Sequence, residues 1–476
     1  MNFFRLHPRL MIAALRGGSG KTILSLGLAS AWKERGHRVA VFKKGPDFID
    51  AGWLSFAAGA PCYNLDPYLM TREQTLGSFS SRSAGADISL VEGNRGLFDG
   101  LDLDGCCSTA ELARTLRTPT VLIVDVTMTT RTIAALVLGC RTFDPDLQLA
   151  GVILNRVGGE RQESIVRGAV ERYCGIPVLG AVPKLRSTVF PERHMGLVPH
   201  LESGAAERAV QWARKVVEQD LDMDALWKIA HAVEPLDPGA RTEEPDLPQP
   251  APAVRIGVLR DRSFWFYYPE NLSQLRSFGA SIAEVDSLAA RELPDLDGLY
   301  IGGGFPETQA EALAGNSVFL TSMREAIAGG LPVYAECGGL MYLGERLVVG
   351  GKTYPMVGAL PISFALEKKP QGHGYTLLEV DGRNPYYPEG TVLKGHEFHY
   401  SKPLVDPSLS LQTVFKVLRG RGIDGHRDGI VRRNLLATYS HLHAGGTSLW
   451  GRGFVRAAQE ARAGGGGFLR ASQKKD

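Results

Sequence analysis

Leu10-Met-Ile-Ala-Ala-Leu15 is followed at once by Arg16-Gly-Gly-Ser-Gly-Lys21-Thr22, and this stretch decides the fold of the first half of the chain. The apolar residues 10–15 predict a buried strand, and residues 22–35 predict a helix. A glycine-rich turn between a strand and a helix lets backbone N–H groups converge on phosphate oxygens. The stretch therefore predicts a phosphate-binding loop at the start of an α/β domain.

The chemistry expected of this loop is ATP binding. The lysine reaches the β- and γ-phosphates, and the threonine hydroxyl is a ligand for Mg²⁺. The residues expected to bind ATP here are Arg16, Gly17, Gly18, Ser19, Gly20, Lys21 and Thr22. The strict Walker A pattern fails, because its first glycine would fall at Leu15. Arg16 instead stands where the deviant Walker motif (KGGxGKT) has its signature lysine.

The rest of the first half alternates short apolar runs with helical patterns. This alternation predicts a doubly wound parallel sheet, with ligand groups at the carboxyl ends of its strands. The expected strands are residues 10–15, 38–42, 88–92, 120–125, 149–155 and 178–182, and the expected helices are 22–35 and 131–138.

A chain of 476 residues is too long for one ordinary core, and its composition marks a boundary. Residues 234–253 are rich in proline and acid and lack periodicity, which predicts a linker. The expected order is an ATPase domain at 1–233, the linker, a second α/β domain at 254–462 and a flexible tail at 463–476. Strands of the second domain are expected at 254–259, 298–301, 333–335 and 435–439.

The composition argues against several classes of function. A net charge of +2 gives no reason to expect nucleic acid or an anionic membrane as a partner. No apolar run approaches the roughly 20 residues that a membrane span needs. The six cysteines show no CxxC spacing, which indicates neither a zinc site nor a disulfide framework and fits the cytoplasm. Small-molecule substrates are expected, and a homodimer is left open.

Leu331-Pro-Val-Tyr-Ala-Glu-Cys337-Gly-Gly-Leu-Met-Tyr-Leu343 is the most informative stretch of the second half. An apolar strand turns through a cysteine into a helical run, which predicts a nucleophile elbow that exposes the sulfur. The N–H of Gly338 is expected to face an oxyanion, and Gly303 and Gly304 in a glycine loop after another strand are expected to complete the oxyanion hole.

Two acidic segments follow strands of the first domain. Asp47 and Asp50 come after the second expected strand, and Glu92 and Asp99 after the third. Carboxylates at strand ends beside a phosphate-binding loop can hold Mg²⁺ or orient a substrate next to the γ-phosphate.

At this point the sequence resembles the cobyrinate a,c-diamide synthase family, in which a dethiobiotin-synthetase-like P-loop ATPase domain precedes a class I glutamine amidotransferase-like domain. The matching stretches run from about residue 10 to residue 445 in one order. They are Gly45-Pro-Asp47-Phe-Ile-Asp50, Glu92-Gly-Asn-Arg-Gly-Leu-Phe-Asp99-Gly, Gly151-Val-Ile-Leu-Asn155-Arg156-Val157, Pro191-Glu-Arg-His-Met-Gly-Leu-Val-Pro199, Phe266-Tyr-Tyr-Pro-Glu270-Asn271 and Glu336-Cys337-Gly-Gly.

The resemblance implies roles for individual residues. Thr22, Asp47 and Glu92 would be Mg²⁺ ligands or their near neighbours, and Asn155 would lie near the adenine. The residues implied at the tetrapyrrole are Asp50 and Asp99, with Arg193 and His194 at its propionate or acetate groups. For these last two, a purely structural loop role is left open.

The resemblance also gives His441 as the base that serves Cys337. Related amidotransferases carry a glutamate two residues after this histidine, where this chain has His443. Either a Cys–His dyad with a low-pKa thiolate suffices, or another acid serves. His396 and His399 have the i, i+3 spacing of zinc ligands on a helix, but their surroundings predict strand and turn, which favours a substrate-facing or structural role.

The function implied is ATP-dependent, glutamine-hydrolysing amidation of the a and c acetate groups of a tetrapyrrole, most readily cobyrinate, through an acyl phosphate. Sirohaem and nickel-sirohydrochlorin are alternative substrates that one sequence cannot separate. A channel and free diffusion both remain open for ammonia. A nucleotide switch of the ParA/MinD type is the rival from another class, but such a protein has no use for Cys337.

Overall fold

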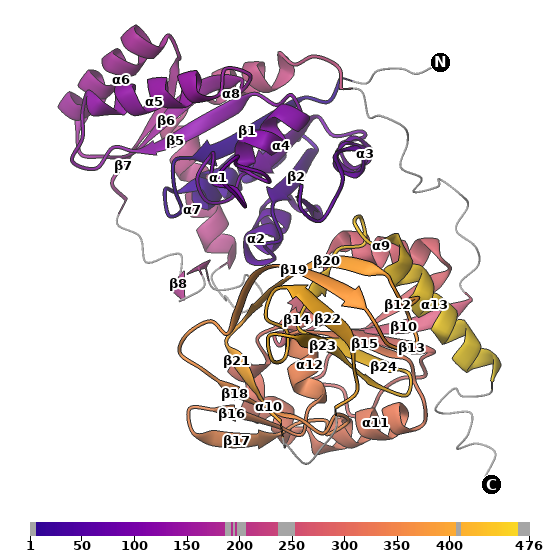
Figure 1. Ribbon diagram of the computed structural model, residues 1–476. Coiled ribbons are helices and arrows are strands. Elements are labelled where there is room, and N and C mark those ends of the chain that lie inside the picture. Colours follow the sequence, from indigo (N-terminus) through magenta and orange to yellow (C-terminus); the bar gives the residue numbers. More distant parts are fainter. Residues whose placement is uncertain are drawn as a thin grey trace, which may run out of the picture. The chain divides into compact units, whose positions relative to one another are not determined.

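The computed structural model describes residues 6–185, 192–193, 196–197, 206–236, 253–405 and 411–464. They belong to two compact units, Met1–Thr242 and Glu243–Asp476, each built around its own main sheet (Figure 1). His194, most of the predicted linker and residues 465–476 lie outside the described residues, as does the side chain of Arg193. In the described part of the chain, no helix is both long enough and apolar enough to cross a membrane.

The N-terminal unit has a seven-stranded, wholly parallel sheet in the order β3-β2-β4-β1-β5-β6-β7. Its strands are β1 Arg9–Ala14, β2 Val39–Lys44, β3 Cys62–Leu65, β4 Ile88–Glu92, β5 Thr120–Asp125, β6 Leu149–Val157 and β7 Val178–Pro183. All six predicted strands are present. The prediction missed β3, so Glu92 ends the fourth strand of the chain and not the third.

Alternate residues of the strands send side chains to opposite faces, and helices cover both faces. Leu10 and Ile12 of β1 pack with α1 Lys21–Glu34, α2 Ile49–Ala58, α7 Ala206–Asp220 and α8 Met223–His231. Met11 and Ala13 pack on the other face with α3 Arg72–Arg82, α4 Thr109–Thr115, α5 Thr132–Phe143 and α6 Glu160–Cys174. The helix that was predicted at residues 131–138 is α5, which continues to Phe143. A short pair, β8 Glu192–Arg193 and β9 Gly196–Leu197, follows β7.

The C-terminal unit has a ten-stranded sheet in the order β12-β10-β13-β15-β24-β23-β22-β19-β20-β25. The first five strands are parallel, namely β12 Ala280–Val285, β10 Val254–Leu259, β13 Gly298–Ile301, β15 Val333–Glu336 and β24 Leu435–Thr438. An antiparallel half continues the sheet with β23 Arg427–Arg432, β22 Thr413–Arg419, β19 Gly372–Val380, β20 Val392–His399 and β25 His441–Leu442. Of these strands the sequence predicted only the strand character around β20.

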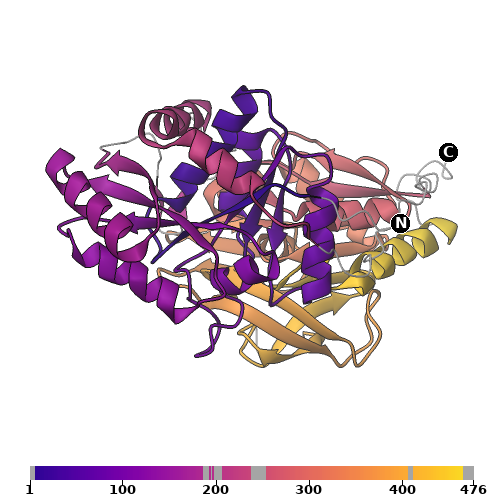
Figure 2. The same cartoon turned by 90° about the horizontal axis from the view of Figure 1, so that it is seen from above.

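Helices again cover both faces of this sheet. One face carries α10 Ala310–Gly315, α11 Ser317–Ala328 and α12 Gly338–Leu343, and the other carries α9 Pro269–Ser277 and α13 Ser448–Ala463. The last helix, yellow in Figure 2, packs against β10, β13 and α9. The remaining elements are β11 Phe264–Phe266, β14 Gly303–Gly304, a 3-10 turn at Pro306–Gln309, and a small sheet of β16 Arg346–Val349, β17 Lys352–Pro355, β18 Ser363–Leu366 and β21 Ser401–Leu404.

Candidate active sites

Cys337 forms the junction between β15 and α12, and its backbone is strained. Its φ of 47° and ψ of −99° place a non-glycine residue at positive φ, which costs of the order of 1–3 kcal/mol. The Cys337 N–H donates to Thr438 O at 2.8 Å, so the neighbouring strand β24 holds the turn. The sharp strand-to-helix turn predicted around this cysteine is thus present.

The three glycines predicted to surround the sulfur lie in one tightly packed region. A Cβ added to Gly303 would lie 2.4 Å from His441 Cε1, and one added to Gly338 would lie 3.1 Å from Gly304 N. Strands β13, β15 and β24 are parallel neighbours, so the loops after them meet at one edge of the sheet. The absence of side chains at Gly303 and Gly338 is what lets the imidazole and the two backbone turns approach each other.

Glu336 is the acidic residue that the structure places against His441, a partner that the sequence left open. Its Oε2 lies 3.4 Å from His441 Nδ1 and accepts a hydrogen bond from Tyr300 Oη at 3.1 Å. Its Oε1 accepts the Leu442 N–H at 3.1 Å. The carboxylate and the imidazole are both almost fully buried. The Glu336 carboxylate therefore fixes the orientation of the His441 ring from the residue directly before Cys337.

His443, which stands in place of the expected glutamate, has a structural setting. Its Nδ1 accepts the Gly445 N–H at 3.1 Å, and its Nε2 lies 3.6 Å from Glu270 Oε1. Asn271 binds the backbone on either side of it, accepting the Ala444 N–H and donating to Leu442 O. The segment that carries His441 is therefore held by residues of the Tyr-Tyr-Pro-Glu-Asn stretch, a role that the sequence analysis did not assign.

His396 and His399 lie on β20, as the predicted strand character required. The His396 ring stacks on His441, with ring centroids 4.9 Å apart and planes 24° apart. Burial and the nearby His441 and His443 hold the pKa of His396 well below its usual range, so it stays neutral. His399 stacks instead on Tyr439, and its Nδ1 lies 2.9 Å from Ser401 O. The uncharged His396 ring thus packs against one face of the His441 imidazole.

The expectation of a low-pKa thiolate at Cys337 is wrong. Burial raises the pKa of the thiol well above its ordinary value, and the carboxylates of Glu307, Glu336 and Glu397 raise it further. The residue is 4% exposed. Because the thiol form is favoured, attack on a substrate requires a base that takes the proton.

We expect iodoacetamide to modify Cys337 slowly and the exposed Cys106 rapidly, with the Cys337 rate still rising as pH passes the ordinary thiol pKa of 9.0. Peptide mass spectrometry after timed quenching measures both rates in one sample. Cys140, a buried thiol whose pKa is also raised, is the internal control for slow modification that is caused by burial. A Cys337 rate that reaches a plateau below the ordinary pKa would contradict this assignment.

The predicted phosphate-binding loop joins β1 to α1 and leaves room for a ligand. Gly18 and Gly20 have φ values of 70° and 94°, and a Cβ on Gly17 or Gly18 would meet nothing within 4 Å. No side chain caps α1, so its first N–H groups are available to an anion. Asn155 supports the loop from β6 by donating to Ser19 O at 2.8 Å.

A buried group of charged side chains lies where β2, β4 and α1 meet. Glu92 Oε1 accepts the Thr22 hydroxyl at 2.9 Å and forms an ion pair with Lys43 Nζ at 2.6 Å. Lys43 also pairs with Asp50 Oδ2 at 2.7 Å. Burial opposes the charge of Lys43, but these two carboxylates outweigh it and raise its pKa. Glu92 Oε2 is buried and accepts no hydrogen bond from the described residues.

Asp47 and Lys21 complete this group. Asp47 Oδ1 accepts the Asp50 N–H at 2.8 Å, and burial together with the Asp50 charge raises the pKa of Asp47 to about 7. Lys21 Nζ donates to Arg95 O at 2.7 Å and to Arg16 O at 3.2 Å. Asp99 accepts the Gly96 N–H at 2.9 Å within the loop after β4. Asp50, expected at a strand end, lies in the first turn of α2.

The outer side of the phosphate loop carries an ion network that the sequence analysis missed. Asp125 Oδ2 pairs with Arg16 at 3.0 Å and with Arg156 at 2.7 Å, and Arg156 also donates to Gly18 O at 3.1 Å. Although burial opposes it, hydrogen bonds from Thr127 and these guanidinium groups lower the pKa of Asp125 to about 2. Asp125 ends β5, so its strand-end position was the signal that could have revealed it.

Two family models match the chain in the order of its two units. Residues 10–197 match the CobQ/CobB/MinD/ParA nucleotide-binding domain, and residues 255–448 match the CobB/CobQ-like glutamine amidotransferase domain. The chain is therefore a two-domain protein in which a nucleotide-binding unit is joined to a glutamine amidotransferase unit, and the predicted fold class is confirmed.

Proteins that are similar to this chain over nearly its whole length identify its family within this class. Cobyrinate a,c-diamide synthase of Magnetococcus marinus is 43% identical, covering 93% of this chain and 95% of the relative. The proteins of that name from Archaeoglobus fulgidus and Dehalococcoides mccartyi are 40% and 38% identical, covering 96% and 97% of this chain and 98% and 99% of the relatives. The chain belongs to the cobyrinate a,c-diamide synthase family, which confirms the resemblance.

Proposed function

We propose that this protein is an ATP-dependent amide ligase that converts the a and c acetate groups of cobyrinate to amides, with nitrogen taken from glutamine. The observation that carries the proposal is the contact of His441 with Glu336, the residue directly before the strained turn at Cys337, in a chain whose other unit presents Lys21, Thr22 and Glu92 at a phosphate-binding loop. Full-length similarity to proteins named for this reaction supports the substrate.

In the glutaminase reaction, His441 takes the proton of the Cys337 thiol as the sulfur attacks the glutamine amide carbon. The Glu336 carboxylate stabilises the imidazolium that forms. The N–H groups of Gly338 and of Gly303 and Gly304 in β14 stabilise the negative charge on the amide oxygen. His441 then returns the proton to the leaving nitrogen, and water hydrolyses the thioester to release glutamate.

In the ligase reaction, the substrate carboxylate attacks the γ-phosphate of ATP, ADP leaves, and an acyl phosphate forms. Ammonia then attacks the acyl carbon and displaces phosphate, which gives the amide. Lys21, the α1 N–H groups and Arg16 neutralise charge on the phosphates. Thr22, Glu92 and Asp47 would hold Mg²⁺, which shields the β- and γ-phosphates when bound. The free, buried Glu92 Oε2 fits that assignment. In this scheme Asp50 and Asp99 would serve the tetrapyrrole, Asn155 the adenine, and Arg193 and His194 peripheral carboxylates of the tetrapyrrole.

The proposal is tested by incubating the purified protein with ATP, Mg²⁺, glutamine and one tetrapyrrole at a time. Mass spectrometry then detects the replacement of carboxylic acids by amides. We expect cobyrinate to give a diamide, and sirohaem or nickel-sirohydrochlorin to react more slowly. Faster amidation of either of these would overturn the substrate assignment and leave the ligase chemistry in place. Amidation of none of them would overturn the proposal itself.

We expect Glu336→Gln to lower kcat for glutamine hydrolysis by about 10²–10⁴-fold, because an amide cannot stabilise the His441 imidazolium. KM for glutamine and ligation from added ammonium should change little, since the phosphate-binding loop is untouched. Steady-state kinetics across a pH series is the measurement, and the pH profile should change shape. Glu345→Gln, an exposed glutamate just after α12, is the matched control. Equal kinetics for the two variants would remove Glu336 from the reaction.

A further inference from the structure

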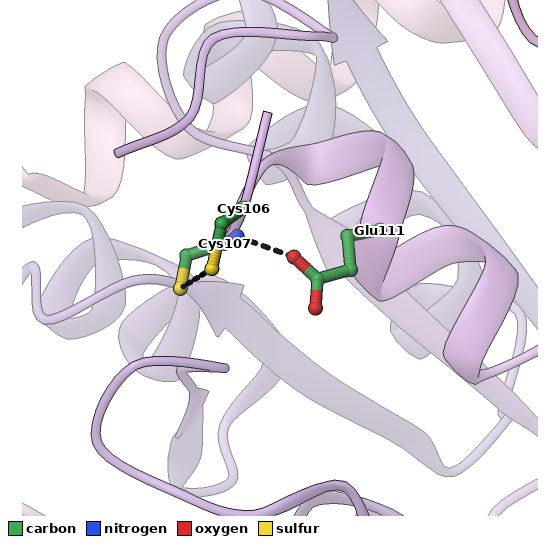
Figure 3. A group of neighbouring side chains, drawn as sticks. All are labelled: Cys106, Cys107 and Glu111. Atoms are coloured by element: carbon green, nitrogen blue, oxygen red, sulfur yellow. Dashed lines mark hydrogen bonds between the residues drawn. The ribbon is translucent and has the colours of Figure 1, made fainter. Parts of the chain in front are cut away.

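The loop between β4 and α4 carries a cluster of soft and hard ligand atoms that neither reaction uses. Within the described residues, Cys106, Cys107 and Glu111 form the single group of at least three His, Cys, Asp or Glu side chains whose donor atoms lie within 4.8 Å of one another (Figure 3). The two sulfurs are 3.2 Å apart. We propose that Cys106, Cys107 and Glu111 form a binding site for a thiophilic divalent cation of the zinc class.

The spacing of the sulfurs favours a shared cation over a direct covalent bond. A trans peptide holds adjacent Cα atoms 3.8 Å apart, below the roughly 4.4–6.8 Å that disulfides prefer. Two thiolates on one tetrahedral Zn²⁺, each at about 2.3 Å, lie about 3.8 Å from each other. The observed separation needs to open by only about half an ångström, which a small side-chain rotation supplies.

Glu111 is held beside the two thiols by the start of α4. One oxygen of its carboxylate accepts the Cys107 N–H, and its own N–H is capped by Ser108 Oγ at 3.2 Å. No described residue hydrogen-bonds the other oxygen, which Figure 3 shows directed away from the Cys107 nitrogen. A hydrogen bond that orients a ligating carboxylate in this way is typical of metal sites.

The backbone around the cysteines is equally well fixed. Asp102 Oδ1 accepts the Cys106 N–H at 2.9 Å, and Cys106 O accepts the Leu101 N–H at 2.7 Å. A Cβ on Gly100 would lie 2.5 Å from Cys106 O, so the backbone at Gly100 and the backbone at Cys106 approach each other closely within the loop. Cys107 is buried while Cys106 is exposed, which gives a cation access from solvent. Two thiolates, one carboxylate and an open fourth position make up a three-ligand zinc site.

The site is tested on the full-length protein, kept reduced with a phosphine and stripped of metal with a chelator that is then removed. Cd²⁺ is titrated, and the thiolate-to-cadmium charge-transfer band is followed in the ultraviolet. Zn²⁺ affinity is measured by competition with a chromophoric chelator. We expect one equivalent of Cd²⁺ to give the band, Zn²⁺ to displace it, and millimolar Mg²⁺ to leave it unchanged. A band that Mg²⁺ abolishes would overturn the proposal.

Variants separate this site from other thiols. Cys106→Ser, at an exposed position, should abolish the band, and Glu111→Gln should weaken Zn²⁺ binding about tenfold or more. Cys140→Ser and Glu73→Gln, the latter in the first turn of α3, are the matched controls and should bind as the parent does. Binding that persists in Cys106→Ser, or that falls equally in the controls, would refute the assignment. None of these readouts depends on the ligase activity.

Discussion

Cys337→Ala is expected to abolish amidation from glutamine, by about 10⁴-fold or more, and to leave amidation from added ammonium intact. In the proposed scheme the sulfur is the nucleophile that frees the nitrogen, whereas ammonium reaches the ligase site without it. Alanine keeps the Cβ atom at the strained turn, so the β15–α12 junction should persist. Product formation from each nitrogen source, measured by mass spectrometry at matched protein concentration, is the readout.

Cys140→Ala controls for the loss of a buried thiol, because Cys140 lies on α5 of the other unit. It should retain both activities. If Cys337→Ala loses the ammonium-dependent reaction as well, with circular dichroism and thermal unfolding unchanged, the assignment of the two chemistries to separate sites is wrong.

For Lys21→Ala we expect ligation to fall by about 10²–10³-fold with either nitrogen source, because the loop loses its buried cation at the β- and γ-phosphates. The Lys21 ammonium bridges two backbone carbonyls of the loop region, and burial together with the nearby Lys43 charge lowers its pKa. Glutamine hydrolysis in the absence of tetrapyrrole should persist. Parallel assays of glutamate and amide product separate the two effects.

Lys33→Ala is the matched control for this change, since Lys33 is an exposed lysine in the last turn of the same helix. It should ligate as the parent does. Retained ligation in Lys21→Ala would remove the phosphate-binding loop from the reaction, whatever the glutaminase does.

In both sites, the sequence predicts well those residues that directly follow a strand. A strand followed by glycines and a helix has few three-dimensional solutions, so the phosphate loop and the Cys337 turn could be recognised from local pattern alone. The carboxylate of Glu92 followed in the same way, because the carboxyl ends of parallel strands meet at one edge, whereas His441 came from the family resemblance.

Partners that depend on strand register could not be predicted. Glu336 meets His441 only because β15 pairs with β24, although the two residues are 105 positions apart. Lys43 meets Glu92 because those two residues are register partners of β2 and β4. The antiparallel strands β19, β22 and β23 were missed because their interrupted alternation, with internal glycines in β19 and β23, gives a weak strand pattern.

The direct test of the account uses glutamine labelled with ¹⁵N in its amide, together with cobyrinate, ATP, Mg²⁺ and unlabelled ammonium at low concentration. Mass spectrometry of the product measures the origin of both new amide nitrogens. The account predicts a diamide in which both nitrogens carry the label, and loss of that label in Cys337→Ala. A diamide that contains only unlabelled nitrogen, or glutamine hydrolysis without any amide product, would contradict it.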